Sequence, residues 1–363
     1  MLIVYVLILG LLSLYSYALV DPNFTLVNHQ LWEIFRNSMV QLGYYQRPLS
    51  LAIFLSLIVA LSFFNWYFTQ KKIEPVKLAM IIAAVLLVSY PFLSHDFFNY
   101  LFDAKILTFY GQNPYLHRAL DFPQDSWLRF MHWTHRTYPY GPGFLLLSLI
   151  PSFFSFGKLL LAFIFFKAMF AFFYVMAVWS LNKFNRQTAL FFATSPLVII
   201  EGLVNNHNDF LAVSFGLLAV YFLHKKKQFL PAGILALFSV GIKYVTLAFV
   251  PLIKKSWQAI GLSVLGFSIL LWYMYLKVGI HPWYLLNLLI ILPFLKKKYV
   301  SFGVLSFGLL LSYYPYILFG GWDLDWKVLI KERVIFVTLL LFLISLFLKQ
   351  FFYFIQKMPF SQK

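Results

Sequence analysis

Residues 49–72 read LSLAIFLSLIVALSFFNWYFTQKK, an uncharged run from Leu49 to Thr69 that ends at Lys71 and Lys72. A helix needs about 20 apolar residues to cross the hydrocarbon of a membrane, and this run is long enough. Polar residues do not recur at every second position, as they would in the strand of an outer-membrane barrel. The stretch therefore predicts a membrane-spanning α-helix with a basic end.

Apolar runs of this kind recur along the chain. Of its 363 residues, 62% are hydrophobic and 11% are charged, whereas a soluble domain carries about 25% charged residues. The longer runs lie near 2–20, 49–69, 76–93, 159–181, 188–203, 257–276, 299–319 and 334–348, and the shorter ones at 143–156, 210–223, 229–242, 244–253 and 282–295. We expect an all-α membrane bundle of about 10–13 spanning or half-spanning helices. We expect it to form one domain over residues 1–363, without a separate soluble C-terminal domain.

The net charge of +17 comes from short basic clusters between the apolar runs. The clusters are Lys71, Lys72 and Lys77; Lys225 to Lys227; Lys254 and Lys255; Lys296 to Lys298; and Lys349, Lys357 and Lys363. Lysine between membrane spans marks the cytoplasmic side, so the charge indicates topology rather than nucleic-acid binding. There is no cysteine, which excludes disulfides and thiolate metal sites.

Placing these clusters in the cytoplasm defines two irregular segments. Run 143–156 is too short to cross and contains Pro151, so it predicts a half-spanning or re-entrant helix. Run 228–253 lies between two cytoplasmic clusters, so it predicts a hairpin with Lys243 near its tip. The most polar loops then share the outer side; they are 21–48, 94–142, 205–209, 277–283 and 320–333.

The segment from Ser94 to Asp103 follows an outward span. As a helix it sets Asp96, Tyr100 and Asp103 on one face, with aromatic residues on the other sides. That pattern predicts an amphipathic helix at the membrane interface, with its polar stripe facing protein or a cavity. The same pattern also fits a solvated helix with ordinary surface acids.

Further motifs follow in order. They are Gly111-Gln112-Asn113-Pro114-Tyr115, Tyr138-Pro139-Tyr140-Gly141-Pro142, Asn206-His207-Asn208-Asp209 and His281-Pro282-Trp283-Tyr284. The histidines at 95, 117, 132 and 135 do not have the spacing of a recognised metal site. A divalent metal is therefore not indicated, and no other cofactor is. Lys243 within an apolar hairpin indicates function, because an ionisable group at membrane depth is costly.

The succession S-x-D-x-x-x-Y, G-x-N-P-Y and Y-G-P, followed by the 206–209 and 281–284 motifs, resembles the GT-C superfamily of integral membrane glycosyltransferases. It looks closest to the polyprenol-phosphate-mannose-dependent α-1,6-mannosyltransferases, from about residue 76 to 295. The resemblance implies transfer of a sugar, such as mannose, from a polyprenyl phosphate on the outer side of the cell membrane. The acceptor would be a glycan or glycolipid, and the configuration at the anomeric carbon would be inverted.

The resemblance also implies roles for individual residues. Asp96 would be the catalytic base, with Asp21 and Asp103 as rivals. Lys243, His207 and Arg136 would bind the phosphate. The substrate-binding candidates are Lys243, His207, Asp209, Arg136, Asp103, Tyr100, Asn113, Tyr115, Tyr140 and His281.

Two other functions fit a protein of this composition. A flippase for lipid-linked sugars or a polysaccharide transporter would use alternating access, and such folds often contain inverted repeats; none is visible here. A structural or assembly protein would not depend on Asp96 or Lys243. The membrane lipids are partners in any case, and the sequence does not indicate an oligomeric state.

Overall fold

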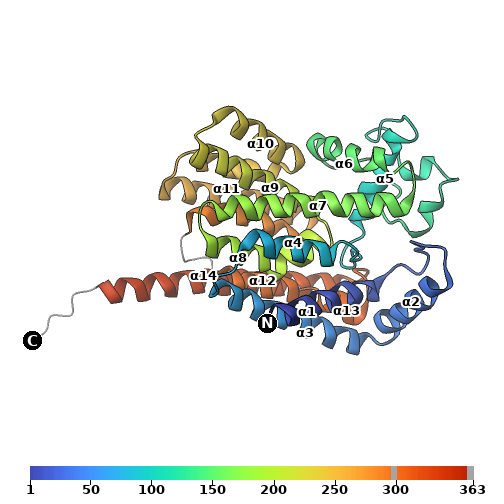
Figure 1. Cartoon of the computed structure of the whole chain (residues 1–363), viewed down its shortest axis with the longest axis horizontal. Helices are drawn as coiled ribbons and strands as arrows, with labels where there is room; N and C mark the ends of the chain where they lie inside the picture. Colours follow the sequence, from blue (N-terminus) through green and yellow to red (C-terminus); the bar gives the residue numbers. More distant parts are fainter. Residues whose placement is uncertain (296–300, 358–363) are drawn as a thin grey trace, which may run out of the picture.

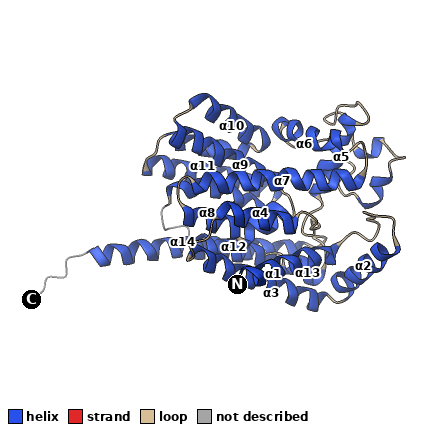
Figure 2. Cartoon of the chain, in the orientation of Figure 1, coloured by secondary structure: helices blue, strands red, loops and turns tan. Residues whose placement is uncertain are grey.

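The computed structural model describes residues 1–295 and 301–357, which form helices joined by loops, with no strand among them (Figures 1 and 2). The α-helices are α1 (Leu2–Tyr15), α2 (Gln30–Val40), α3 (Arg47–Thr69), α4 (Pro75–Leu86), α5 (Asp96–Thr108), α6 (Pro142–Phe154), α7 (Leu159–Asn182), α8 (Arg186–Thr194), α9 (Asn208–Tyr221), α10 (Phe229–Ile242), α11 (Trp257–Val278), α12 (Ser301–Leu311), α13 (Tyr314–Phe319) and α14 (Asp325–Lys357). Short 3₁₀ or π segments are η1 (Ser16–Leu19), η2 (Gln41–Tyr45), η3 (Ala119–Asp121), η4 (Ser126–Phe130), η5 (Val198–Val204), η6 (Phe222–Lys226), η7 (Tyr244–Ile253) and η8 (Pro282–Phe294). Lys296 to Lys298 and Lys363, in two of the predicted cytoplasmic clusters, lie outside the described residues.

Five segments among the described residues are long and apolar enough to cross a membrane; they are Leu2–Leu19, Arg47–Thr69, Leu159–Asn182, Trp257–Val278 and Ser301–Phe319. Only 22% of the apolar window in α11 is buried inside the protein, so most of this helix needs lipid as its solvent. Shorter apolar helices of 10–17 residues are α4, α6, α10, η7 and η8. These features confirm the predicted all-α polytopic bundle of a multi-pass membrane protein.

Several segments differ from the sequence prediction. The predicted span 76–93 is helical only over α4, which ends at Leu86. The run 188–203 is not a straight span, because α8 and η5 meet at an angle of 63°. Ser195 is extended before Pro196, the residue type that disfavours helix before it. The predicted loop 21–48 contains the amphipathic helix α2, and the predicted loop 320–333 already belongs to α14 from Asp325 onward.

The predicted hairpin forms around Lys243. Helix α10 ends at Ile242, Lys243 has an extended backbone, and η7 begins at Tyr244. Helix α6, predicted as a half-spanning helix, has 13 residues. The helices α2 and α5 lie at one end of the molecule, opposite the end toward which the C-terminal part of α14 extends (Figure 1).

Helices α6 and α10 touch backbone to backbone. A Cβ atom on Gly143 would lie 2.8 Å from the carbonyl carbon of Gly241, and one on Gly141 would lie 2.0 Å from the Gly241 oxygen. Only glycine allows helices to approach this closely. The contact brings the end of α10, and thus Lys243, beside the segment that carries Tyr140.

Replacing Gly143 with valine should separate α6 from α10. We expect the free energy of unfolding in detergent to fall by about 1–3 kcal/mol, as for other overpacked contacts. Gly303→Val is the matched control, because nothing lies within 4 Å of its Cβ position near the start of α12. Equal stability of the two variants in chemical unfolding would contradict the close contact.

Candidate active site

Asp96 is the first residue of α5. The backbone N–H of Asp96 donates to Ser94 Oγ at 3.2 Å, just before the helix. The partial positive charge of a helix N-terminus favours a carboxylate in this first turn. The Asp96 side chain is 21% exposed, so it can reach a ligand.

Two side chains from other parts of the chain, Arg136 and His207, face Asp96. A guanidinium nitrogen of Arg136 lies 3.7 Å from Asp96 Oδ1, and His207 Nδ1 lies 4.0 Å from Asp96 Oδ2. The same guanidinium donates to the Tyr140 hydroxyl at 3.1 Å. Neither contact is short enough to be a hydrogen bond. The Asp96 oxygens therefore still have free acceptor positions.

Lys243 meets the residues that open α9. Its Nζ lies 2.9 Å from Asp209 Oδ2, and the other Asp209 oxygen accepts a hydrogen bond from Asn287 at 2.9 Å. The Lys243 ammonium also lies 5.2 Å from the centre of the Tyr284 ring, a cation–π distance. Asp209 is almost fully buried, whereas the Lys243 side chain is 16% exposed. An ammonium has three donors, so Lys243 can bind an anion while it keeps Asp209.

The 281–284 motif packs directly on the 206–209 motif. The Trp283 ring stacks on His207 at a centroid distance of 4.1 Å and on His281 at 4.3 Å. Burial, together with the nearby Lys331 charge, lowers the pKa of His281 well below its usual value. His281 is therefore a neutral imidazole against the indole at physiological pH.

Tyr100 and Asp103 lie behind Asp96 on α5, and both are buried. Residues 97 to 106 are all buried, so protein surrounds the predicted amphipathic helix on every face. Burial raises the pKa of Asp103 to about 7, against the opposing effect of Arg136. Asp103 thus lies in the wall behind the site and is not an open ligand.

Asn113 and Tyr115 belong to a separate, exposed loop. Asn113 Oδ1 accepts from the backbone N–H of Tyr115 at 3.0 Å, and the Tyr115 hydroxyl donates to the Tyr140 carbonyl at 3.3 Å. Tyr138 donates its backbone N–H to the Pro114 carbonyl at 2.9 Å. These bonds tie the 113–115 loop to the 138–140 segment, which supports a loop-organising role for both residues.

The rival base Asp21 lies in a second cluster beside Asp96. His132 Nε2 is 3.8 Å from Asp21 Oδ2, and the His132 ring stacks on His95 at 3.7 Å. Burial opposes ionisation of Asp21, but His132 and the Asn23 N–H hold its pKa below the usual value. In the described part of the chain, no group of three or more metal-ligating side chains is placed to hold a metal ion.

Sequence reasoning missed two buried charges, Glu201 and Lys167. Glu201 Oε2 lies 3.3 Å from His207 Nε2 and accepts from Asn205 Nδ2 at 3.0 Å. Lys167 donates to the carbonyls of Leu203 and Val204 at 3.0 and 2.7 Å, which holds the end of η5. The signal was present, because each is a lone ionisable residue inside a run that was treated as apolar.

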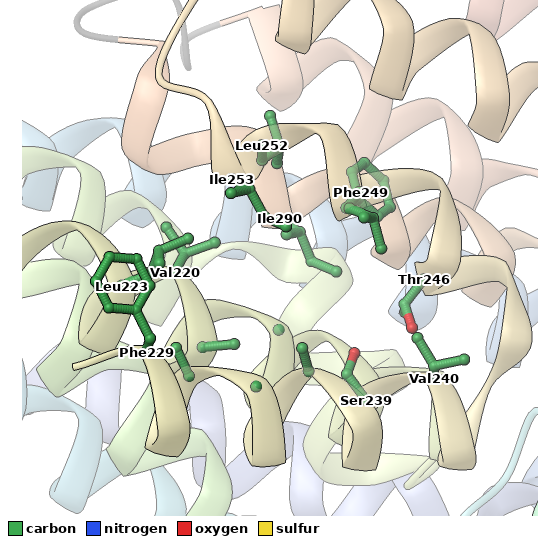
Figure 3. Close-up of a pocket in the computed structure, with 16 residues that line it drawn as sticks. Val220, Leu223, Phe229, Ser239, Val240, Thr246, Phe249, Leu252, Ile253 and Ile290 are labelled. Atoms are coloured by element: carbon green, nitrogen blue, oxygen red, sulfur yellow. The ribbon is translucent and has the colours of Figure 1, made fainter. Parts of the chain in front are cut away.

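An apolar cavity of about 210 Å³ lies along the hairpin of Lys243 (Figure 3). Ser239 and Val240 of α10 and Thr246 of η7 line one end, close to Lys243 in the sequence, and Phe229 and Ile253 line the other. A second apolar cavity, of about 410 Å³, lies between α11, η8, α12 and α14. Both cavities have the chemistry of a site for a hydrocarbon chain.

Comparison with known families places most of the chain in a family of membrane enzymes. Residues 8–259 match the family model described as alpha-(1->6)-mannopyranosyltransferase, N-terminal domain. The matched region includes Asp96, Arg136, His207, Asp209 and Lys243. Neither a curated protein nor a solved structure matches the chain.

Asp103→Asn should change how stability depends on pH. The folded wild-type protein keeps a proton on Asp103 that the unfolded chain releases, so wild-type stability falls as pH rises from about 4 to 7. Asparagine cannot ionise, so the unfolding free energy of the variant does not fall in this way. Relative to wild type, it should rise by up to about 4 kcal/mol over this range. Denaturant unfolding at pH 5 and pH 8 measures the difference.

Asp323→Asn is the control for this comparison. The hydrogen bond from Lys327 lowers the pKa of Asp323, so its carboxylate stays ionised throughout the same pH range. A pH-independent difference between Asp103→Asn and wild type would show that Asp103 is ionised in the folded protein.

Proposed function

The chain belongs to the alpha-(1->6)-mannopyranosyltransferase family and is a membrane glycosyltransferase, and from this membership we propose that its sugar donor is a polyprenyl phosphate mannose. The acceptor is a glycan or lipid-linked glycan outside the cytoplasm. The observation that carries the proposal is the meeting of Asp96 and Lys243 through residues 207–209. Both side chains remain partly exposed among buried neighbours.

The transfer needs a base and a site for the leaving phosphate. Asp96 takes the proton from an acceptor hydroxyl while that oxygen bonds to the anomeric carbon of the sugar. The bond from this carbon to the phosphate oxygen breaks at the same time, and the electron pair leaves with the lipid phosphate. Lys243 and Arg136 stabilise the charge on that phosphate. A single displacement inverts the anomeric centre, so a β-linked donor yields an α-linked product.

Asp209 has a supporting role in this scheme. It is a buried carboxylate that accepts from Asn287 and pairs with Lys243, so it places the ammonium beside the start of α9. Removing one partner of a buried pair leaves an unpaired charge, which is strongly destabilising. Asp209 therefore holds Lys243, while the free donors of Lys243 bind the phosphate.

The cavity of Figure 3 supports a polyprenyl carrier. Its walls come from α9, α10 and η7, and its lining is almost wholly apolar, so an isoprenoid chain can lie there. Lys243 stands at the turn between α10 and η7 and can hold the phosphate at the end of that chain.

The positions of the charges support an outer active site. Helix α9 begins at Asn208, next to His207, and leads through η6 to the cluster Lys225 to Lys227. The site and this cluster therefore lie at opposite ends of the helix. Since clusters of lysine mark the cytoplasmic side, we place Asp96 and Lys243 on the extracytoplasmic side.

Asp96→Asn should reduce transfer of radiolabelled mannose from polyprenyl phosphate by about 10²–10⁴-fold, because asparagine cannot accept the proton. Donor binding should persist, because Lys243 and Arg136 are retained. Turnover in proteoliposomes and donor binding by filter assay measure the two effects, and Asp21→Asn distinguishes the rival base. If Asp96→Asn turns over as fast as wild type, Asp96 is not the base. If wild-type protein moves the donor across the vesicle membrane but does not consume it, the protein is a flippase.

Gly233→Phe should fill the cavity beside the hairpin. Gly233 lines this cavity, and nothing lies within 4 Å of its Cβ position. We expect KM for a long-chain donor to rise about 10-fold, roughly the effect of 1.4 kcal/mol, while KM for a donor with a single isoprene unit stays constant. Gly261→Phe on α11 is the matched control, because its Cβ position is also open.

Ser268→Phe tests the second cavity in the same assay, because Ser268 lines it. If Ser268→Phe rather than Gly233→Phe changes the dependence on chain length, the lipid tail lies between α11 and α14. Equal KM values for long and short donors in wild type would contradict any tail site.

A further inference from the structure

Glu201 is a buried carboxylate in a segment that would otherwise be apolar. It lies in η5, between the bend at Pro196 and the start of α9, and its exposed fraction is 0%. Placing an ionisable group at such a position is costly unless it has a partner. A π-type turn, such as η5, is also most frequent at functional sites.

His207 is the partner of Glu201. The distance from Glu201 Oε2 to His207 Nε2 is 3.3 Å. Among the described residues, no other basic side chain lies within 4.0 Å of the Glu201 carboxylate. Asn205 donates to the same carboxylate oxygen at 3.0 Å, and the Tyr313 hydroxyl faces the carboxylate from the α12–α13 junction. The contact between Glu201 and His207 is close but lacks hydrogen-bond geometry, and His207 Nε2 has no hydrogen-bond partner in the described structure.

The His207 ring is held in one orientation. Trp283 stacks on it at 4.1 Å with an interplanar angle of 13°, and only 1% of the His207 side chain is exposed. The Nε2 atom points to Glu201, and the Nδ1 atom lies 4.0 Å from Asp96 Oδ2. Both ring nitrogens therefore face carboxylates, and the phosphate contact expected from the sequence stays a prediction.

The turn that carries this row of groups is fixed from two sides. The side-chain oxygen of Asn205 accepts from the backbone N–H of Leu93 at 3.2 Å, next to the segment that leads to Asp96. Lys167 binds the last carbonyls of η5 from α7. The order Glu201, His207, Asp96 is thus set by contacts between α5, α7 and η5.

We propose that Glu201 is a positioning residue that holds the proton on His207 Nε2, so that Nδ1 serves as the proton acceptor behind Asp96. The inference rests on the proposed function, in which Asp96 is the base. The proton that Asp96 takes from the acceptor hydroxyl passes to His207 Nδ1, and Asp96 becomes a carboxylate again. The imidazolium then lies between two carboxylates until it releases that proton to water. A carboxylate behind a histidine sets the tautomer in this way in other enzymes.

The first test is Glu201→Gln, which keeps the shape and an acceptor oxygen for Asn205 but removes the charge. We expect kcat for mannose transfer to fall about 10- to 100-fold with donor KM unchanged, at the low end of the effect of general acid–base groups. In a His207→Asn background, Glu201→Gln should produce no further loss, because the two residues act in series. An unchanged kcat, or an undiminished loss in the His207→Asn background, would overturn the proposal.

Lys167→Met is the matched control for a purely structural effect. It disturbs the same η5 segment but removes no group that faces His207 in the described structure. We expect it to lower the midpoint of thermal unfolding, and its effect on kcat should be the same with and without His207. If Glu201→Gln behaves like this control, Glu201 only supports the fold.

The second test does not require any variant at Glu201 to fold. In wild-type protein with ¹⁵N-labelled histidine, NMR should show His207 protonated on Nε2 and unprotonated on Nδ1, with the signal assigned by its loss in His207→Asn. A neutral ring protonated on Nδ1 would overturn the proposal. Failure of the proposed function can be told apart from failure of this inference. If the proposed function is wrong, Asp96→Asn keeps wild-type turnover. If Asp96→Asn is inactive but Glu201→Gln is normal, only the role of Glu201 is refuted.

Discussion

The ion pair between Lys243 and Asp209 is the contact on which the arrangement of the site depends. Its 2.9 Å distance joins the break in the α10–η7 hairpin to the first turn of α9. In a bundle that is surrounded by lipid, neither charge can be buried without the other. The motifs 206–209 and 281–284 also meet here, where His207 lies against Trp283.

Two carboxylates occupy the first turns of helices at this site, Asp96 on α5 and Asp209 on α9. A helix N-terminus stabilises negative charge, so both positions suit a carboxylate. They differ in exposure. Asp209 is buried and contacts Lys243 and Asn287, while Asp96 remains partly exposed between Arg136 and His207. The same residue type therefore serves as a structural counterion in one place and is open to substrate in the other.

Most of the fold was predictable, because apolar runs near the length of a membrane crossing form helices wherever lipid is the solvent. The hairpin at Lys243 and the short α6 followed from lysine clusters and run lengths. The 63° bend between α8 and η5 did not, since a proline permits a kink without setting its angle. Glu201 and Lys167 were overlooked because average hydropathy hides one charge among many apolar neighbours.

The sequence alone determined that the protein is a helical membrane protein and placed its motifs in the order of a glycosyltransferase family, because run length and motif order are local properties of the chain. The tertiary structure decided which charges pair: Lys243 with Asp209, His207 with both Asp96 and Glu201. It also decided that Tyr100 and Asp103 lie in the wall, and that Asn113 and Tyr115 organise a loop. The physical reason is that partners far apart in sequence are selected by bends and close helix contacts, such as those at Pro196 and Gly241, whose geometry depends on the packing of the whole bundle.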